Sequence, residues 1–402
     1  MNKFQTKLAL AGNISAVAIA CALPISTTAT DILFALAVLF NLAAGNLKEK
    51  FNFIVQNRIA VLFLAFFALF VIGMFYGNTP SKDAWFMLGK YDKLLLGILL
   101  FPLFAEEKWR KLALQVFFYT MLAILSLSCL KAAYYAYLGL PLADAILFKK
   151  HIAYSIFMAF FFYLLLLKTF AEKRPQRWLW IAILVLTFIN IFFINDGRTG
   201  YFIFACLTAI FFLQKTNWSW KGWLMAIASV IFLLGLAAGA SHTFQSRLNE
   251  VSSDVKSYQN KNEDTSFGAR MAFVKNTIPI IKQHIIFGGG TGSFQPEYAN
   301  LKPRPASFTR NPHNEYLHVM AQFGIIGLLL LLFIFYSQLR LSRYLPNQLG
   351  WIAQAVIITV MIGSLVNSLL LDSAEGHFYV YFIALTFAAL PQECWWKKRY
   401  FI

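Results

Sequence analysis

Three polar residues, each beside a long apolar segment, have side chains that could do chemistry: Arg198, Arg270 and His313. A guanidinium group donates two parallel hydrogen bonds in one plane, which suits a phosphate or a diphosphate. Imidazole has an ordinary pKa of about 6.5, so a histidine can accept the proton of a hydroxyl group at neutral pH. These residue types predict two anion-binding groups and one general base.

Each of the three residues also has an ordinary structural explanation. Arg198 follows Asp196-Gly197, a pair typical of tight turns, and could simply reach lipid headgroups. Arg270 could be a solvated residue at the start of an amphipathic helix, and His313 a structural histidine after Pro312. His318 follows five residues later, about 140° round a helix, so a metal site made by the two histidines is not expected.

The secondary-structure elements that position these residues can be inferred from the composition, which is unusually apolar. Of the 402 residues, 59% are hydrophobic and only 13% are charged, whereas a soluble domain has roughly a quarter charged residues. The composition therefore excludes an ordinary water-soluble fold. Four cysteines without paired spacing indicate neither a disulfide framework nor a thiolate metal site.

The apolar segments predict an all-α polytopic membrane protein, because only helices satisfy their backbone within lipid in such a sequence. A bilayer core of about 30 Å leads us to expect about twelve transmembrane helices, at approximately 8–28, 30–46, 59–77, 92–105, 113–137, 152–171, 178–195, 199–214, 222–240, 314–338, 350–371 and 376–391.

The distribution of basic residues predicts the orientation of these helices. The net charge of +17 comes from 35 basic and 18 acidic residues. One set of alternate connections holds about 19 basic residues, and the short loops of the other set hold about six. The positive-inside rule therefore places both termini in the cytoplasm and requires an even number of spans.

The predicted organisation has four parts. Helices one to nine occupy residues 1–240, a large non-cytoplasmic loop occupies 241–313, the last three helices occupy 314–391, and a basic cytoplasmic tail occupies 392–402. Within the loop we expect a mobile polar stretch at 252–265, a half-buried helix at 269–287, a turn at 288–292 and an extended segment at 302–305. The glycine run at 288–292 lacks the Lys-Ser/Thr of a nucleotide-binding loop, so we interpret it as a hinge.

A few other polar residues are predicted on the same side of the membrane. Lys90 and Lys93 could contact a diphosphate or anchor headgroups. Asp372, Glu375 and His377 share one predicted short loop, where a solvated turn is favoured over a sugar or cation site. The predicted spans are nearly free of carboxylates, which disfavours an ion-coupled transporter. No Asp-x-Asp pair is present, which argues against a metal clamped by carboxylates.

Three motifs in this order and spacing resemble the O-antigen ligase and polymerase superfamily of bacterial envelope proteins. They are Arg198-Thr199-Gly200, then Arg270 followed by the segment 287–294 (Phe-Gly-Gly-Gly-Thr-Gly-Ser-Phe), then 313–317 (His-Asn-Glu-Tyr-Leu) running into 324–327 (Gly-Ile-Ile-Gly). The predicted spans and the single large loop agree with this resemblance. One departure is Val274, where the family often has tryptophan.

The resemblance implies a GT-C-type glycosyltransferase of the bacterial inner membrane with its active site facing the periplasm. Its donor would be a glycan on undecaprenyl diphosphate, its acceptor a sugar hydroxyl of lipid A–core, and its reaction inverting, with no metal, no other cofactor and no nucleic-acid partner. His313 would be the general base, and Arg198 and Arg270 would bind the diphosphate. Lys90, Lys93, Asn314 and Tyr316 are predicted to bind substrate.

Alternative functions remain open from the sequence. A polymerase of the same superfamily would join repeat units lipid to lipid. A protein O-oligosaccharyltransferase would use a Ser or Thr acceptor, but such chains usually have a larger C-terminal portion, and this one ends about ten residues after its last predicted span. A lipid-glycan flippase would carry charged groups inside its spans and would not depend on His313.

Overall fold

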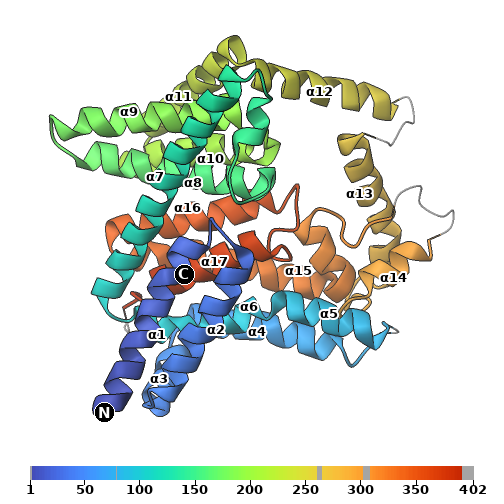
Figure 1. The fold of residues 1–402 in the computed structure, drawn as a ribbon. Helices are drawn as coiled ribbons and strands as arrows, with labels where there is room; N and C mark the ends of the chain where they lie inside the picture. The colour runs from blue at the N-terminus through green and yellow to red at the C-terminus, as the bar shows by residue number, and fades with distance from the viewer. Residues whose placement is uncertain (1, 78, 260–264, 302–307, 392–402) are drawn as a thin grey trace.

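The computed structural model describes residues 2–77, 79–259, 265–301 and 308–391, and every regular element in these ranges is helical (Figure 1). The first half comprises α1 (Lys3–Ala22), α2 (Thr27–Ala43), α3 (Leu47–Gln56), α4 (Arg58–Gly73), α5 (Ser81–Tyr91), α6 (Lys93–Leu100), η1 (Phe101–Phe104), α7 (Glu107–Tyr137), η2 (Leu142–Ala145), α8 (His151–Ala171), α9 (Gln176–Ile189) and η3 (Asn190–Ile194). The second half comprises α10 (Arg198–Lys215), α11 (Trp220–Ala240), α12 (His242–Gln259), α13 (Ser266–Gln283), α14 (Phe294–Ala299), α15 (Glu315–Leu341), η4 (Ser342–Tyr344), α16 (Asn347–Gly363) and α17 (Ser373–Phe387).

Several of these helices are long and apolar enough to cross a membrane. By length and composition, six helices of the described residues qualify, and α3 with α4, which meet at 87°, would add a seventh as one broken span. The qualifying helices are α1, α7, α8, α9 with η3, α11, and α15 with η4. The prediction of an all-helical protein with several membrane-spanning helices is therefore confirmed.

Not all of the twelve predicted spans correspond to a single long helix in the structure. The segment predicted at 92–105 is divided between α6 and η1, with Pro102 in the short 3-10 turn, because proline cannot continue an α-helix. The segment predicted at 376–391 corresponds to α17, which has 15 residues and begins three residues earlier. Twelve spans and a GT-C-type arrangement stay predictions.

The core of the bundle is built around α8. In the apolar stretch of α8, 89% of the residues are buried inside the protein, against 11% for α11. Figure 1 shows α8 between α7, α10 and α16. Because α11 presents almost all of its apolar side chains outward, we expect lipid rather than water to cover it.

The most unusual element is α15, which is broken at Gly324. This residue has φ 61° and ψ −157°, outside the helical region. The segment 285–290 inserts at the break and supplies the missing hydrogen bonds: Gly289 N to Ala321 O (3.0 Å), Gly290 N to Gln322 O (2.9 Å) and Ile325 N to Ile285 O (2.8 Å). The end of the large loop is thus fixed to the middle of α15.

The glycine run that follows α13 is a packed turn. All five of its amides donate within the protein: Gly288 N to His284 O, Gly289 N to Ala321 O, Gly290 N to Gln322 O, Thr291 N to Gly73 O and Gly292 N to the side-chain oxygen of Gln322. Since no amide of the run is free, it offers nothing to a phosphate. The predicted turn is present, and its contacts hold it in place, which does not fit the predicted hinge.

Replacing Gly324 with alanine is expected to lower the free energy of unfolding by roughly 2–4 kcal/mol. An added Cβ would lie 2.3 Å from the carbonyl carbon of Ile286, and φ is positive, so the segment 285–290 could not stay docked. Thermal unfolding of the purified protein in detergent measures the effect. Gly235→Ala in α11 is the control, because its Cβ meets no atom within 4 Å; equal stability of the two variants would contradict the prediction.

The large loop differs in part from its predicted structure. Helix α13 covers most of the predicted helix but ends at Gln283 instead of residue 287. The stretch expected to be mobile is helical up to Gln259, at the end of α12, and Asp254 within it faces Arg198. The rest of that stretch up to residue 264, the predicted extended segment 302–305 and the tail 392–402 lie outside the described residues.

Candidate functional site

Arg198 is the first residue of α10, and a rigid turn holds it there. Asn195 is fully buried. Its side-chain oxygen accepts a hydrogen bond from the Gly197 amide (3.1 Å), and its carbonyl accepts one from the Tyr201 hydroxyl (2.7 Å). The predicted tight turn is therefore present, and it fixes the direction in which α10 begins.

The residues next to Arg198 dock α10 on its neighbours. A Cβ on Gly197 or Gly200 would lie within 2.6 Å or 2.3 Å of side-chain atoms of Ser155 in α8, so only glycine allows this approach. The Thr199 hydroxyl accepts a hydrogen bond from the Asn367 amide (2.9 Å). Thus Thr199 and Gly200 of the motif pack α10 against its neighbours, and neither contact uses the guanidinium group of Arg198.

Acidic residues of α12 face the guanidinium of Arg198. Its Nη2 lies 3.6 Å from Glu250 Oε2 and its Nη1 lies 3.5 Å from Asp254 Oδ2. The same helix is tied to the turn by Arg247, which pairs with Asp196 and, at 2.5 Å, with Glu250. Long contacts between partly exposed charges contribute little free energy, so a diphosphate could replace the two acids at Arg198.

Arg270 lies in the second turn of α13, and Thr265 is the N-cap of this helix. The Thr265 hydroxyl caps the helix by accepting from the Gly268 amide (3.0 Å). Arg270 is half-buried, and none of the described carboxylates forms an ion pair with it. Burial lowers the pKa of its guanidinium, and the nearby charge of Arg198 lowers it further, yet arginine stays charged at neutral pH.

His313 sits in a strained turn directly before α15. Its φ is 50°, which is uncommon for a residue other than glycine. The side-chain oxygen of Asn311 holds the turn by accepting from the His313 amide (2.9 Å) and from the Ser368 hydroxyl (3.1 Å). The imidazole stacks on Phe273 of α13, with ring centroids 5.6 Å apart and planes at 26°.

The ring nitrogens of His313 are available for a substrate. Among the described residues, none forms a hydrogen bond or ion pair with the imidazole. Burial lowers the pKa of His313, and the charge of Arg270 lowers it further. The imidazole is therefore neutral at pH 7, as a general base must be.

The structure links the three predicted residues in pairs. Arg270 and Phe273 lie three residues apart on α13, and Phe273 stacks on the imidazole of His313, in the turn before α15. The charge of Arg198, at the start of α10, lowers the pKa of Arg270, and the charge of Arg270 lowers the pKa of His313. In Figure 1, α12 and α13 connect the end of the bundle that holds α10 and α11 with α14 and α15. Two guanidinium groups and a neutral imidazole at one surface can bind an anion and accept a proton.

Asn314 and Tyr316, both predicted to bind substrate, make contacts that position α15. Asn314 caps the helix by accepting from the Leu317 amide (3.0 Å), and its side-chain nitrogen donates to the Leu365 carbonyl (2.9 Å). The Tyr316 hydroxyl donates to the Met361 carbonyl of α16 (2.8 Å). These contacts favour a positioning role, and substrate binding by the two residues stays a prediction.

Glu315 is an important residue of the motif that the sequence analysis did not single out. It is fully buried. Its carboxyl group accepts from the Tyr91 hydroxyl (2.5 Å) and from the amides of Leu370 (3.0 Å) and Leu371 (3.3 Å). The sequence could have indicated this role, because Glu315 is the first residue of a long apolar helix and a buried carboxylate needs hydrogen-bond donors from other parts of the protein. Glu315 ties the start of α15, and with it His313, to two other parts of the bundle.

Lys93 has a structural role of its own. It is 3% exposed, and its ammonium donates to the carbonyls of Asp372 (2.9 Å) and Leu371 (3.3 Å). Such burial does not fit the anchoring of lipid headgroups, and the contacts described here do not join Lys93 to the arginines. Diphosphate binding by Lys93 stays a prediction.

Lys90 lies at a second cationic surface that includes a residue missed by the sequence analysis. The Lys90 ammonium lies 5.4 Å from the ring centroid of Phe86, and the guanidinium carbon of Arg310 lies 5.9 Å from the same centroid. Arg310 is exposed and precedes His313 by three residues. The sequence could have indicated Arg310 as a candidate, because it lies so close to His313 in the chain. Both cations could attract an anionic substrate toward the histidine.

The interpretation as a solvated turn is wrong for Glu375 and His377, whereas Asp372 is exposed in the turn before α17. Asp372 is the N-cap of α17, and the other two lie inside that helix, 6% and 5% exposed. His377 Nε2 lies 3.2 Å from Asp31 Oδ1 of α2. The helix begins earlier than predicted because Lys93 and α2 pack against its first turn. Within the described ranges, no three His, Cys, Asp or Glu residues cluster as metal ligands.

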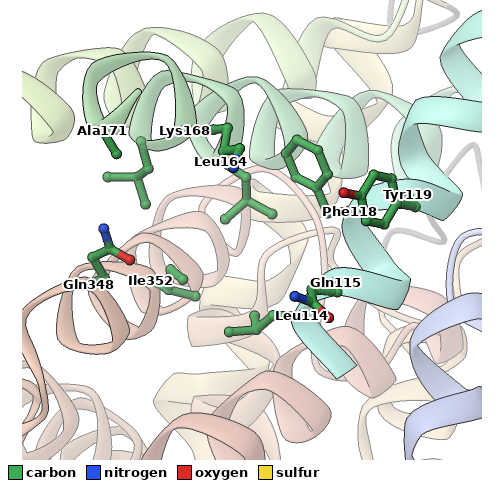
Figure 2. A pocket seen from close by; sticks show the side chains of 10 residues that line it. Leu114, Gln115, Phe118, Tyr119, Leu164, Lys168, Ala171, Gln348 and Ile352 are labelled. Carbon is green, nitrogen blue, oxygen red and sulfur yellow. The ribbon is translucent and has the colours of Figure 1, made fainter. Parts of the chain in front are cut away.

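A separate, mainly apolar cavity of about 350 Å³ lies between α7, α8 and α16. Figure 2 shows Phe118 and Tyr119 of α7 on one side and Gln348 and Ile352 of α16 on another. Lys168 of α8 also lines it, and Glu172 pairs with this lysine at 2.5 Å. None of the predicted site residues lines this cavity, so it is distinct from the candidate site.

The helices and the site define an all-helical membrane protein with a cationic, histidine-containing polar site. Residues 182–332 match the family model described as O-antigen ligase. The match supports an O-antigen ligase family for this segment, so the resemblance drawn from the motifs is confirmed. The segment contains Arg198, Arg270 and His313.

One relative gives less information about activity. An uncharacterized protein of Haemophilus influenzae (strain ATCC 51907 / DSM 11121 / KW20 / Rd) is 27% identical over 188 residues, which are 45% of this chain and 47% of the relative. The alignment thus spans about half the length of that relative. Its name assigns it no activity, so the reaction and the substrates are argued from the site.

Proposed function

We propose that this protein is an O-antigen ligase. It transfers a glycan en bloc from undecaprenyl diphosphate to a sugar hydroxyl of lipid A–core, at the periplasmic face of the bacterial inner membrane. The proposal is supported by the stacking of His313 on Phe273 of α13, three residues after Arg270, within a segment that matches the family and also contains Arg198.

The chemistry follows from the two kinds of side chain. The imidazole of His313 accepts the proton of the acceptor hydroxyl while that oxygen forms a bond to the anomeric carbon. The bond from this carbon to the diphosphate oxygen breaks, and undecaprenyl diphosphate leaves with the bonding electron pair. Arg198 and Arg270 stabilise the negative charge that grows on the leaving group. Attack opposite the leaving group inverts the anomeric centre, and the proton then passes from His313 to water or to the departing diphosphate.

Deletion and complementation distinguish the ligase from a polymerase. Cells without the ligase accumulate lipid-linked glycan and show bare lipid A–core, whereas cells without a polymerase show core that bears a single repeat unit. Gel electrophoresis of lipopolysaccharide from a deletion strain, with and without this gene, reads out the difference. Restoration of long chains on bare core supports the proposal, and conversion of single units into long chains would assign polymerase activity.

The pH dependence of transfer is a second expectation. Because burial and Arg270 both lower the pKa of His313, the imidazole loses its proton at a lower pH than an ordinary histidine. The rate is expected to reach half of its maximum at a pH below the ordinary histidine pKa of about 6.5. Initial rates of the purified protein with lipid-linked donor, from about pH 5 to about pH 8, test this. A half-maximal rate at or above about pH 6.5 would be incompatible with this environment of His313.

A further inference from the structure

A cavity of about 370 Å³ lies between the end of α4 and the segment that joins α13 to α14. Tyr76 and Thr79 line it from the segment after α4, and Gln283, His284, Glu297 and Asn300 line it from α13, α14 and the residues next to them. The predicted site residues do not line this cavity. It is separate from the arginine and histidine site.

Backbone contacts hold both walls of this cavity in place. The Tyr76 hydroxyl donates to the Phe287 carbonyl (2.7 Å), and the Thr291 amide and hydroxyl donate to the carbonyls of Gly73 (2.9 Å) and Phe70 (2.6 Å). The same turn is docked on the break in α15. The cavity is therefore preformed, which reduces the entropy that a ligand must lose on binding.

Several polar groups in the cavity lack partners. Glu297 Oε2 and Thr79 Oγ1 are buried atoms without a hydrogen bond to any described residue. A Cβ on Gly289 would lie 2.0 Å from Glu297 Oε1, so the glycine makes room for the carboxyl group. Burial raises the pKa of Glu297, and His284 opposes that shift. Buried polar atoms without partners cost free energy, which a hydroxyl-bearing ligand would recover.

The combination of groups selects one class of ligand. A carboxyl group repels a phosphate, so a second diphosphate site is excluded here. Glu297 and His284 are only two potential metal ligands, and the described residues hold no larger cluster. A carboxylate, an imidazole, a hydroxyl and the amides of Gln283 and Asn300 suit vicinal sugar hydroxyls, which both donate and accept hydrogen bonds.

We propose that this cavity is a carbohydrate subsite in which Glu297 and Thr79 bind hydroxyl groups of a sugar that does not itself react. The imidazole of His313 stacks on Phe273 of α13. Phe273 and Gln283, which lines the cavity, are ten residues apart on this helix, about 15 Å along its axis. A sugar chain long enough to reach both places could come from the donor glycan or from the lipid A–core. The proposal rests on the transfer of glycans proposed above.

Steady-state kinetics of the full-length protein in detergent test the subsite. Donor and lipid A–core are varied in turn for wild type, Glu297→Gln and Thr79→Val. We expect the KM for one of the two substrates to rise about tenfold in Glu297→Gln, with kcat changed less than about twofold, because a binding contact away from the reaction is lost. The substrate whose KM rises identifies the source of the sugar. Glu107→Gln, an exposed residue on α7, is the matched control.

A binding measurement keeps the subsite testable apart from the transfer reaction. Saturation-transfer NMR is run on the same proteins with two probes, the deacylated core oligosaccharide and the glycan released from its lipid. Wild type should bind one probe, and Glu297→Gln and Thr79→Val should bind it about tenfold more weakly, with thermal unfolding unchanged. An unchanged KM for both substrates, or equal binding by wild type and both variants, would overturn the subsite. Absence of transfer by wild type, with binding retained, would overturn only the proposed function.

Discussion

Replacing His313 with alanine is expected to reduce glycan transfer by roughly 100- to 10,000-fold. The acceptor hydroxyl would then have no base near the arginines, while the Asn311 contacts that shape the turn would be retained, since they use the backbone of residue 313. The variant is expressed in cells that lack their own enzyme. The amount of glycan attached to lipid A–core is measured on gels, beside an immunoblot of the membrane fraction.

The control for this variant is His242→Ala, which removes an exposed histidine at the start of α12. It should leave transfer unchanged. A His313→Ala protein that is present at the wild-type level and attaches the wild-type amount of glycan would refute the assignment of the base.

Replacing Arg270 with alanine is expected to reduce transfer by roughly 100- to 1,000-fold, the usual effect of removing one donor to a developing negative charge. Arg270→Lys should restore only part of the rate, because an ammonium cannot form two parallel hydrogen bonds. Arg270 is a better target for this test than Arg198, because Glu250 and Asp254 lie near Arg198 and its replacement would also disturb these two acids. The initial rate with lipid-linked donor is the measurement.

The same variant has a second expected effect, which a purely structural role would not produce. Arg270 lowers the pKa of His313, so its removal should raise that pKa and move the acid fall in rate to higher pH. Arg343→Ala, at an exposed position in η4, should change neither the rate nor the pH profile. An unaltered rate in Arg270→Ala would remove the residue from the site, and an unaltered profile would show that it does not act on the histidine.

The class of the fold was predictable, and the three candidate site residues could be proposed, because both depend on local signals. Few charges and long apolar runs leave only the helix for most of the chain. The turn before Arg198 and the proline before His313 mark the ends of such runs, where a polar side chain meets the membrane surface. The structure then placed His313 against Phe273 of α13, the helix that carries Arg270.

The lengths of the last helices were harder to predict, because hydropathy does not distinguish lipid from a protein interior. Glu375 and His377 lie inside α17, although their polarity indicated a loop. Lys93 is likewise buried and bonded to the carbonyls that precede this helix. His377 pairs with Asp31 of α2, and Lys93 bonds to carbonyls almost 280 residues away in the chain; a single sequence does not show these partners.

By itself, then, the sequence determined a helical membrane protein and predicted two arginines and one histidine as its site residues. Only the tertiary structure decided how these are held: by the break at Gly324 that receives the segment 285–290, and by the buried Glu315 that anchors the helix beside His313. The reason is physical. Hydrophobic periodicity and turn residues act within a few positions along the chain, whereas these hydrogen bonds join groups from tens to hundreds of residues apart and exist only after the helices have packed.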